Sequence, residues 1–348
     1  MIATAGSPKR SPTSTRSAPI PAFWPPRIWP ADGSPHQADR RLDGATGPIC
    51  SSGRRSVLMG GMTSPALQDI VALLGCPAAG NPAQYLFERA ISAAGLDWRF
   101  LTFDVLPERL AQALGGIDAM GFRGCLLSGA LQEGAMEERV MGEGQVGLLA
   151  HASPAARFAG AASLVEHQAG GLFGHMTDGR GIVEALRAHA DLAAARVVIA
   201  GAGPTGRATA LELALAGVAE ILVADRSPQR ATTLVERLRE LDTSAEITLL
   251  TAEPPIEIPQ RAGIVVVSRG QDESPAIFSG LRADLVLADT ELVEQPSVVV
   301  AAGQKAGCCV VDGLEVHVAK IAIDFQVLTG TEPDTDMLRE ALEEFLSG

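Results

Sequence analysis

Aromatic residues are scarce in this sequence, at 4% of its 348 residues, and positive charge is outweighed, since the net charge is −13. Nucleic-acid-binding surfaces combine positive charge with aromatic platforms, so both features argue against nucleic acid as a partner. No uninterrupted apolar run approaches the roughly 18 residues expected of a transmembrane helix. The sequence therefore favours a protein that binds neither nucleic acid nor membrane.

The five cysteines are odd in number and scattered, and they form no CxxC pair with further ligands at zinc spacing. No other spacing of His, Cys, Asp or Glu suggests a metal site, so we predict none. Cys308 and Cys309 stand in an apolar run, and we expect both to be buried strand residues. A reducing, cytoplasmic setting fits this pattern best.

Residues 1–61 differ from the rest, with nine of the 22 prolines and eight Lys or Arg against three Asp. Such a segment buries too little apolar surface to fold, so we predict a disordered tail. An alternative is a start codon assigned too far upstream, with Met59 or Met62 as the true start. Arg54 and Arg55 faintly resemble a twin-arginine export signal, but polar residues follow at 68–69, so export is not expected.

From residue 69 onward, apolar runs of strand length alternate with helical periodicity, a βαβ rhythm that predicts an α/β fold with a parallel sheet. The expected elements before residue 195 are strands at 70–74, 98–104, 121–128 and 162–166, and helices at 83–94, 107–114 and 182–192. Thr177 or Asp178 is the expected N-cap of the last of these helices. A second alternation runs over 196–311, and two helices, 315–329 and 335–346, close the chain.

A glycine-rich motif opens the second alternation. The strand Val197–Ala200 leads into Gly201-Ala202-Gly203-Pro204-Thr205-Gly206, a helix over 207–216 and a second strand over 221–224. The first glycine permits a tight turn, the second lets the backbone approach a pyrophosphate, and the third lets helix and strand pack closely. This order of elements indicates a dinucleotide-binding Rossmann unit, and a glycine-rich turn without ligand is the alternative.

Asp225 ends the second strand, where a carboxylate typically accepts a hydrogen bond from the adenosine ribose and repels a 2′-phosphate. Arg226 and Arg230 follow, and either could bind such a phosphate or simply be solvated. We therefore favour NAD, with NADP open. The candidate cofactor-binding residues are Gly201, Ala202, Gly203, Pro204, Thr205, Gly206, Asp225, Arg226, Arg230 and Ser268.

Several motifs together resemble the shikimate dehydrogenase family over residues 64–346. Thr177-Asp178-Gly179 resembles its Asn-Thr-Asp-Gly, and Asp225-Arg226-Ser227 resembles its Asn-Arg-Thr. The other similar segments are Gly95-Leu96-Asp97, Phe103–Glu108, Met120–Gly124, Val311–Leu314 and Leu328–Gly330. The resemblance implies a substrate domain facing a Rossmann domain across a cleft, and an NAD(P)-dependent dehydrogenase.

The family's substrate residues are mostly replaced. Its catalytic lysine falls on Gln132, its early Ser-x-Ser on Asn81-Pro82-Ala83, and a glutamine of its closing helix on Lys320. Its asparagines fall on Ser163 and Met176, whereas Asp178 and Thr177 remain. The resemblance thus implies a rebuilt pocket, and shikimate is not the expected substrate.

Asp178 and Lys320 are the candidate catalytic pair, because dehydrogenation of an alcohol needs a proton-transfer group near the carbinol. Lys320 stands in an otherwise apolar stretch, where an idle lysine would be costly. The alternative is that Asp178 caps its helix and Lys320 forms a structural ion pair. His317, three residues before Lys320, is a weaker candidate. The candidate substrate-binding residues are Asn81, Ser128, Gln132, Ser163, His175 and Thr177.

The sequence thus predicts a substrate domain over 62–177, completed by helices over 315–348, and a Rossmann domain over 178–314. The expected activity is NAD(P)-dependent oxidation or reduction of a small polar hydroxy or keto compound, in a monomer or homodimer. Two alternatives stay open: a catalytically silent nucleotide-binding sensor or regulatory protein, and a dehydrogenase of a pterin-linked one-carbon unit.

Overall fold

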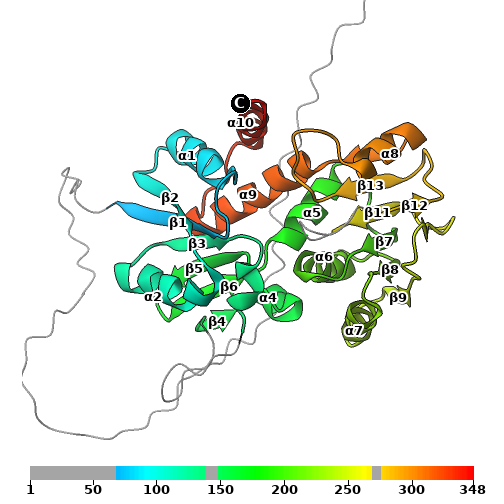
Figure 1. Cartoon of the computed structure of the whole chain (residues 1–348), viewed down its shortest axis with the longest axis horizontal. Helices are drawn as coiled ribbons and strands as arrows, with labels where there is room; N and C mark the ends of the chain where they lie inside the picture. The colour runs from blue at the N-terminus through cyan, green and yellow to red at the C-terminus, as the bar shows by residue number, and fades with distance from the viewer. Residues whose placement is uncertain (1–67, 138–147, 269–275) are drawn as a thin grey trace, which may run out of the picture. The chain divides into compact units, whose positions relative to one another are not determined.

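The computed structural model describes residues 68–137, 148–268 and 276–348. The predicted tail, the alternative start sites and the twin-arginine pair lie outside the described residues. Within the described ranges, no helix has the length and apolarity needed to cross a membrane. Two six-stranded sheets organise this part of the chain (Figure 1).

The first sheet has the strand order β2-β1-β3-β5-β6-β4. Its strands are β1 (Asp69–Gly75), β2 (Trp98–Asp104), β3 (Gly124–Leu127), β4 (His151–Ala152), β5 (Leu164–Gln168) and β6 (Gly171–His175). Strands β1, β2 and β3 pair in parallel, as the βαβ rhythm predicts, but β5 runs antiparallel to both β3 and β6. The predicted parallel pairing is therefore confirmed for β1, β2 and β3, and the first sheet continues beyond β3 with antiparallel strands.

The antiparallel part is the β-hairpin of β5 and β6, of which only the first strand was predicted from the sequence. Gly171 has a φ of 107°, which favours glycine and allows β5 to turn directly into β6. A tight turn can join only antiparallel strands, whereas parallel strands need a longer crossover. The predicted strand at 162–166 is thus one arm of a hairpin, and its partner β6 was not predicted.

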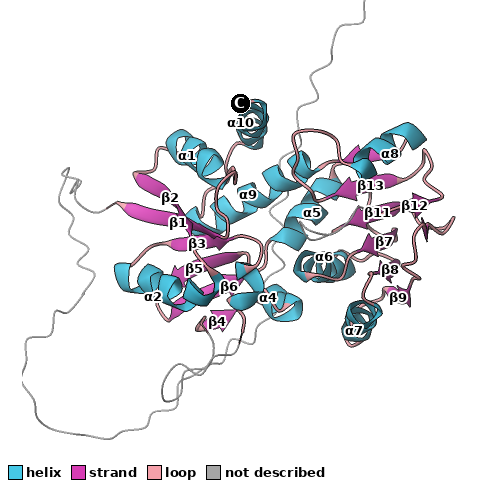
Figure 2. Cartoon of the chain, in the orientation of Figure 1, coloured by secondary structure: helices cyan, strands magenta, loops and turns pink. Residues whose placement is uncertain are grey.

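The helices are α1 (Ala83–Ala93), η1 (Pro107–Arg109), α2 (Leu110–Met120), α3 (Leu131–Gly134), α4 (Pro154–Ala159), α5 (Asp178–Arg187), α6 (Pro204–Leu215), α7 (Pro228–Arg239), α8 (Val298–Ala306), α9 (Gly313–Thr329) and α10 (Thr335–Ser347). Helix α2 ends six residues later than predicted, because Gly115 and Gly116 continue it and left-handed Gly121 ends it. Helix α5 starts at Asp178 instead of Ile182. Figure 2 shows how these helices flank the two sheets.

Helices α1, α9 and α10 cover one face of the first sheet. Their core includes Phe87 from α1, Phe100 from β2 and Phe325 from α9, with the Phe87 ring centroid 4.8 Å from that of Phe100 and 5.7 Å from that of Phe325. Aromatic pairs at these separations add specific contacts to the burial of apolar surface. Helix α9, from the end of the chain, thereby packs in the same core as α1 and β2.

The second sheet has the order β14-β13-β11-β7-β8-β9, and all of its pairs are parallel. Its strands are β7 (Arg196–Ala200), β8 (Glu220–Ala224), β9 (Glu246–Leu249), β11 (Ile264–Val267), β13 (Val286–Asp289) and β14 (Cys309–Val311), and a separate short pair joins β10 (Ile256–Glu257) to β12 (Phe278–Ser279). In chain order this sheet reads 3-2-1-4-5-6 from β9, which is the Rossmann arrangement. Cys309 is exposed, so its predicted burial is wrong.

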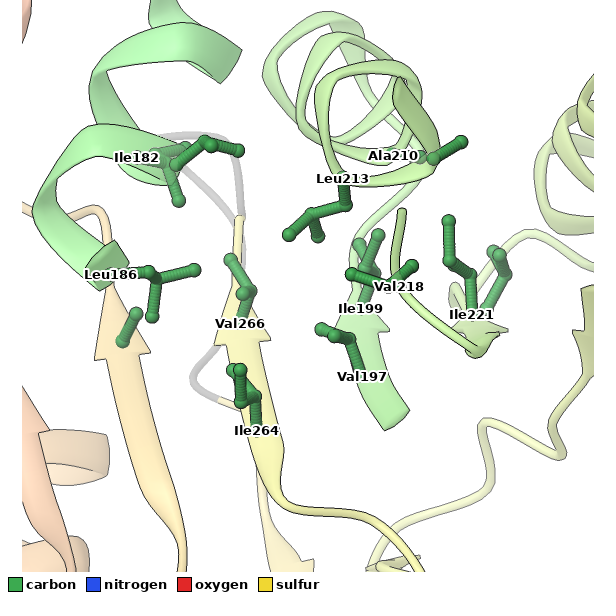
Figure 3. Close-up of a cluster of buried hydrophobic side chains, with 14 of the residues drawn as sticks. Ile182, Leu186, Val197, Ile199, Ala210, Leu213, Val218, Ile221, Ile264 and Val266 are labelled. Carbon is green, nitrogen blue, oxygen red and sulfur yellow. The ribbon is translucent and has the colours of Figure 1, made fainter. Parts of the chain in front are cut away.

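Helices α5 and α6 cover one face of the Rossmann sheet. Figure 3 shows Ile182 and Leu186 of α5 and Leu213 of α6 above Ile199 of β7 and Val266 of β11, all buried. Helix α9 contributes Val316 and Ala319 to this same core while its other faces pack on the first sheet. Helix α9 therefore connects the two cores.

Candidate functional site

The glycine loop lies where the strand order of the Rossmann sheet reverses, between β7 and β11. Gly201 has a φ of 126°, and a Cβ on it would lie 1.7 Å from the Ser268 carbonyl oxygen. A Cβ on Gly206 would lie 2.0 Å from the Gly201 oxygen. These glycines are required by the packing of the protein itself, and they place the loop at the crevice where such sheets bind ligands.

Gly203 differs from the other two glycines. A Cβ built on Gly203 meets no described atom within 4 Å, and its φ of −71° is accessible to any residue. The position is thus open space at the N-terminus of α6, where backbone N–H groups favour an anion. Gly203, with Thr205 and Gly206 beside it, could hold a dinucleotide pyrophosphate in this cradle.

Asp225 follows β8 and is almost wholly buried. Its Oδ2 accepts a hydrogen bond of 2.6 Å from the Ala202 backbone, inside the glycine loop, and its Oδ1 accepts from Ser227 N at 2.8 Å and Arg230 Nε at 3.0 Å. Arg230 is therefore tied to Asp225 by an ion pair. The carboxylate braces the loop as well as bordering the adenosine side of the cradle, and Arg226 is exposed next to it.

A polar cluster joins the N-terminal ends of α5 and α6 to α9. Lys320 Nζ lies 3.6 Å from Asp178 Oδ1, within ion-pair distance. Asp178 Oδ2 accepts hydrogen bonds from Gln132 Nε2 at 3.4 Å and Thr205 Oγ1 at 3.2 Å. Asp178 Oδ1 is buried and accepts no hydrogen bond from the described part of the chain. The cluster thus places an ammonium and a carboxylate oxygen without a hydrogen-bond donor beside the glycine loop.

Asp324 also belongs to this cluster, although it was not predicted from the sequence. Lys320 Nζ donates to Asp324 Oδ2 at 2.6 Å, so Asp324 is a closer partner of Lys320 than Asp178 is. Thr177 Oγ1 donates to Asp324 Oδ1, also at 2.6 Å. A usable signal was present, since an acidic residue four positions after a lysine in an apolar helix indicates an ion pair.

Thr177 and Ser163 form the buried end of the cluster. Because the Thr177 hydroxyl proton points to Asp324, Ser163 Oγ must donate to Thr177 Oγ1, at 3.0 Å, while it accepts from Thr177 N. Thr177 stands at the N-cap of α5, but its side chain makes no capping bond. The predicted N-cap position is therefore confirmed, but the hydroxyl donates to Asp324 and does not cap the helix.

Two glycines explain why these groups meet. A Cβ on Gly179 would lie 2.4 Å from the Ala208 carbonyl carbon of α6, and one on Gly181 would lie 2.9 Å from Lys320 Cβ of α9. Only glycine permits helices to approach this closely. Helix α5 is therefore in backbone contact with α6 and α9, and this places Asp178 between the glycine loop and Lys320.

The electrostatics of the cluster favour a protonated lysine. Burial by itself lowers the pKa of Lys320, but Asp324 and then Asp178 outweigh it, so the pKa is raised above its ordinary value. Burial raises the pKa of Asp324, and Lys320 and Thr177 oppose that rise. His317, one turn before Lys320, is the opposite case, because burial and then Lys320 lower its pKa to about 3. A neutral His317 therefore lies on the same helix as the ammonium.

Comparison with known proteins identifies the family. The sequence model of the family described as Shikimate / quinate 5-dehydrogenase matches residues 184–274. A relative from Rubrobacter xylanophilus, named shikimate dehydrogenase (NADP(+)), is 31% identical over 292 residues, covering 79% of this chain and 95% of the relative. The chain belongs to the shikimate dehydrogenase family. The predicted family, its fold and its class of NAD(P)-dependent dehydrogenases are thereby confirmed.

Solved structures agree with this family assignment. The ligand-free 5-ketofructose reductase of Gluconobacter sp. strain CHM43 is 28% identical, with a TM-score of 0.71, covering 80% of this chain and 99% of its own. Shikimate 5-dehydrogenase of Thermus thermophilus, in complex with NADP(H) and shikimate, is 27% identical, with a TM-score of 0.66, covering 80% of this chain and 100% of its own. Proteins with this fold are thus named for more than one substrate.

The remaining predicted pocket residues have other partners in this member of the shikimate dehydrogenase family. Asn81 Oδ1 accepts from the Ala83 backbone N–H at 2.9 Å, a local hydrogen bond just before α1. His175 Nε2 lies 3.1 Å from Glu166 Oε2, and that hydrogen bond is the main cause of the lowered pKa of Glu166. Ser128 follows β3, its Oγ close to Gly75. None of these contacts joins the Lys320 cluster.

Gly203→Val tests the cradle. Because nothing in the described structure occupies the space of a new side chain there, the variant should fold, with a loss of stability of about 1 kcal/mol at the helix N-cap. The side chain should block backbone approach and abolish binding of NAD(H) and NADP(H), measured by calorimetric titration. Gly263→Val, an equally unhindered change before β11, is the control and should bind normally. Undiminished binding by Gly203→Val would contradict the assignment of the cradle.

Proposed function

We propose that this member of the shikimate dehydrogenase family interconverts the alcohol and ketone of a small polar compound other than shikimate, with NAD(P) as cofactor. The observation that carries the proposal is the 3.6 Å contact between Lys320 Nζ and Asp178 Oδ1, with Gln132 at the position of the family's lysine. The proton-transfer group has moved from α3 to α9 and still meets the same aspartate.

In this proposal Lys320 is the proton donor in the direction of reduction. A bound nicotinamide supplies the hydride at the reacting carbon, or accepts it in the reverse direction. The Lys320 ammonium, with its raised pKa, donates a hydrogen bond and then its proton to the carbonyl oxygen, and it recovers a proton from solvent. Oxidation uses the same steps in reverse, so Lys320 then acts as the base.

Asp178 orients the substrate. Its Oδ2 is held by Gln132 and Thr205, while its buried Oδ1 is available to accept a hydrogen bond from a substrate hydroxyl. A buried acceptor without a donor is costly, so a hydroxyl that satisfies it gains both affinity and orientation. Thr205 also belongs to the glycine loop, and the contact therefore couples the substrate position to the cofactor position.

Two observations support a substrate other than shikimate. Lys320, Asp178 and Asp324 place one positive and two negative charges together, so a carboxylate substrate would bring a further negative charge to a net negative site. The likeness to 5-ketofructose reductase, a protein named for an uncharged keto sugar, points the same way. We therefore propose an uncharged polyhydroxy ketone, or the corresponding alcohol, as the substrate class.

We further propose the boundaries inferred from the sequence: a substrate domain over 62–177 completed by 315–348, and a Rossmann domain over 178–314. The two sheets and the double role of α9 support this division. We also propose a cytoplasmic location and a monomer or homodimer. The free cysteines Cys76, Cys125, Cys308 and Cys309 are consistent with the reducing setting of the cytoplasm.

Substrate profiling tests the proposed function. A screen of polyhydroxy ketones with NADH and NADPH, including 5-ketofructose, should reveal consumption of the reduced cofactor by absorbance. Shikimate should be turned over at least about 10³-fold less efficiently, since several hydrogen bonds worth about 1–3 kcal/mol each are absent. Efficient turnover of shikimate would overturn the substrate proposal, and the absence of turnover with any compound would favour a silent nucleotide-binding protein.

Lys320→Met tests the catalytic assignment. Methionine keeps the volume of the lysine stem but removes the proton, so kcat should fall by about 10²–10⁴-fold while dinucleotide affinity stays unchanged. Lys305→Met, on exposed α8, is the matched control and should keep full activity. A Lys320→Met enzyme with normal kcat would reduce Lys320 to a structural role.

Asp225→Asn tests the choice of dinucleotide, for which we propose NAD(H). The family has asparagine here, so the carboxylate adds a negative charge beside the site of a 2′-phosphate. The ratio of Kd for NADP(H) to Kd for NAD(H) should exceed one in the native protein and fall about tenfold in Asp225→Asn. Asp242→Asn, an exposed change, is the control. An unchanged ratio, with Tm confirming the fold, would mean that Asp225 only braces the loop.

A further inference from the structure

Asp324 is a wholly buried carboxylate whose two oxygens contact different elements. Its Oδ2 receives the Lys320 ammonium at 2.6 Å, and its Oδ1 receives the Thr177 hydroxyl at 2.6 Å. The first contact is within α9 and the second reaches across to the start of α5. The carboxylate therefore sits at the junction of the two helices that carry the candidate catalytic pair.

Helix packing alone does not require this arrangement. Burial of a carboxylate and an ammonium costs free energy that their attraction only partly returns, and an apolar pair of similar volume is often as stable. Asp324 is surrounded by the apolar core of α9, with Ile323 and Phe325 as its neighbours in sequence. The buried charge of Asp324 is therefore better explained by its effect on its partner, Lys320.

The contacts of Lys320 indicate that this effect is to restrict the position of its ammonium. A lysine side chain has four rotatable bonds, and in the absence of a near partner its ammonium samples many positions. The 2.6 Å bond to Asp324 holds one N–H of the ammonium, whereas Asp178 lies at 3.6 Å, beyond a hydrogen bond. The remaining N–H groups are thereby turned to the side of Asp178, where a substrate oxygen would be reached.

We propose that Asp324 is a positioning residue that anchors the Lys320 ammonium for proton transfer, and that Ser163 and Thr177 fix Asp324 in turn. This inference rests on the proposed function of Lys320. Ser163 donates to Thr177 at 3.0 Å, and Thr177 donates to Asp324 at 2.6 Å, so the carboxylate is held on the side opposite the lysine. These contacts hold the Asp324 carboxylate in one position. Its hydrogen bond to Lys320 then holds the ammonium in one position as well.

The anchor also keeps the lysine charged. Removal of the negative charge at 2.6 Å leaves burial, which lowers the pKa of Lys320, opposed only by Asp178. Asp324→Asn is close in size to the native side chain and removes that charge. The variant should therefore release the Lys320 proton at lower pH than the native protein does, whichever substrate the enzyme uses.

Amine labelling measures this effect without a known substrate. The chain has only three lysines, Lys9, Lys305 and Lys320, so trace acetylation by acetic anhydride followed by peptide mass spectrometry resolves each one. Exposed Lys305 is the internal reference. The midpoint pH for labelling of Lys320 should fall by about one unit or more in Asp324→Asn and return toward the native value in Asp324→Glu.

Asp312→Asn is the matched control. It makes the same chemical change on the same helix, where Asp312 Oδ1 caps the first turn of α9 by accepting from Glu315 N at 3.1 Å. It should lower Tm but leave the labelling midpoint of Lys320 unchanged. An Asp324→Asn protein that is destabilised and yet keeps the native midpoint would overturn the proposal and leave Asp324 a structural residue.

A second variant tests the same proposal if the Asp324→Asn protein misfolds. Thr177→Val is nearly isosteric and removes only the hydroxyl that holds Asp324 Oδ1, so it should shift the Lys320 midpoint in the same direction by a smaller amount. No shift in this variant, if Asp324→Asn cannot be purified, would overturn the proposal.

Turnover separates this inference from the proposed function. With 5-ketofructose and NADH as the probe, Asp324→Asn should lower kcat at least about tenfold, leave KM within about twofold and move the pH profile of kcat to lower pH. If the native protein turns over no polyol or keto sugar, the proposed function fails while the labelling result still tests the anchor. A labelling shift accompanied by unchanged kcat would overturn the catalytic part of the proposal.

Discussion

The backbone contact of α5 with α6 and α9 is the constraint on which the rest of the site depends. Gly179 and Gly181 have no side chains to hold the helices apart, and any Cβ there would lie within 3 Å of the neighbouring helices. Side chains of ordinary length can then bridge the helices directly. Asp178 reaches Thr205 on one side and Lys320 on the other because of this approach, so the glycines set the distances on which the chemistry relies.

The charged cluster is stable because its charges compensate one another. Lys320 lies between two carboxylates, and hydrogen bonds from Gln132, Thr177 and Thr205 satisfy further carboxylate oxygens. A single buried ionisable group would instead become neutral, a cationic group by losing its proton and a carboxylate by gaining one. The lowered pKa of His317, on the same helix, illustrates this. Removal of one partner from such a group is more harmful than its absence from the start, because the others stay buried and unpaired.

The proposed move of the catalytic lysine from α3 to α9 changes the chemistry of the pocket less than the sequence suggests. Gln132 keeps a hydrogen bond to Asp178 at the former lysine position, while Lys320 approaches the same aspartate from another helix. Asp178 keeps its position, and a cationic side chain can approach it from α3 or from α9. What does change is the net charge, because Asp324 brings a second carboxylate with the new lysine.

The sequence by itself determined the Rossmann unit and the family. Periodicity and glycine spacing act locally, so the strands around residues 201–206 and the two closing helices could be placed without tertiary information. The resemblance also placed Lys320 opposite Asp178, because order along the chain is preserved within a family. Its limits appear at β6 and α2, where a hairpin partner and a glycine-containing helix depend on pairing and packing beyond the local sequence.

Only the tertiary structure decided the partners of the polar groups. Asp324 became part of the site because α9 turns it toward Thr177, a contact between residues 147 positions apart. His175 has Glu166 as its partner, because the register of β5 and β6 pairs His175 with Leu164 and sets Glu166 diagonally across from it. Hydrogen-bond partners depend on distances of a few tenths of an ångström between distant segments, and such distances follow from helix packing and strand register.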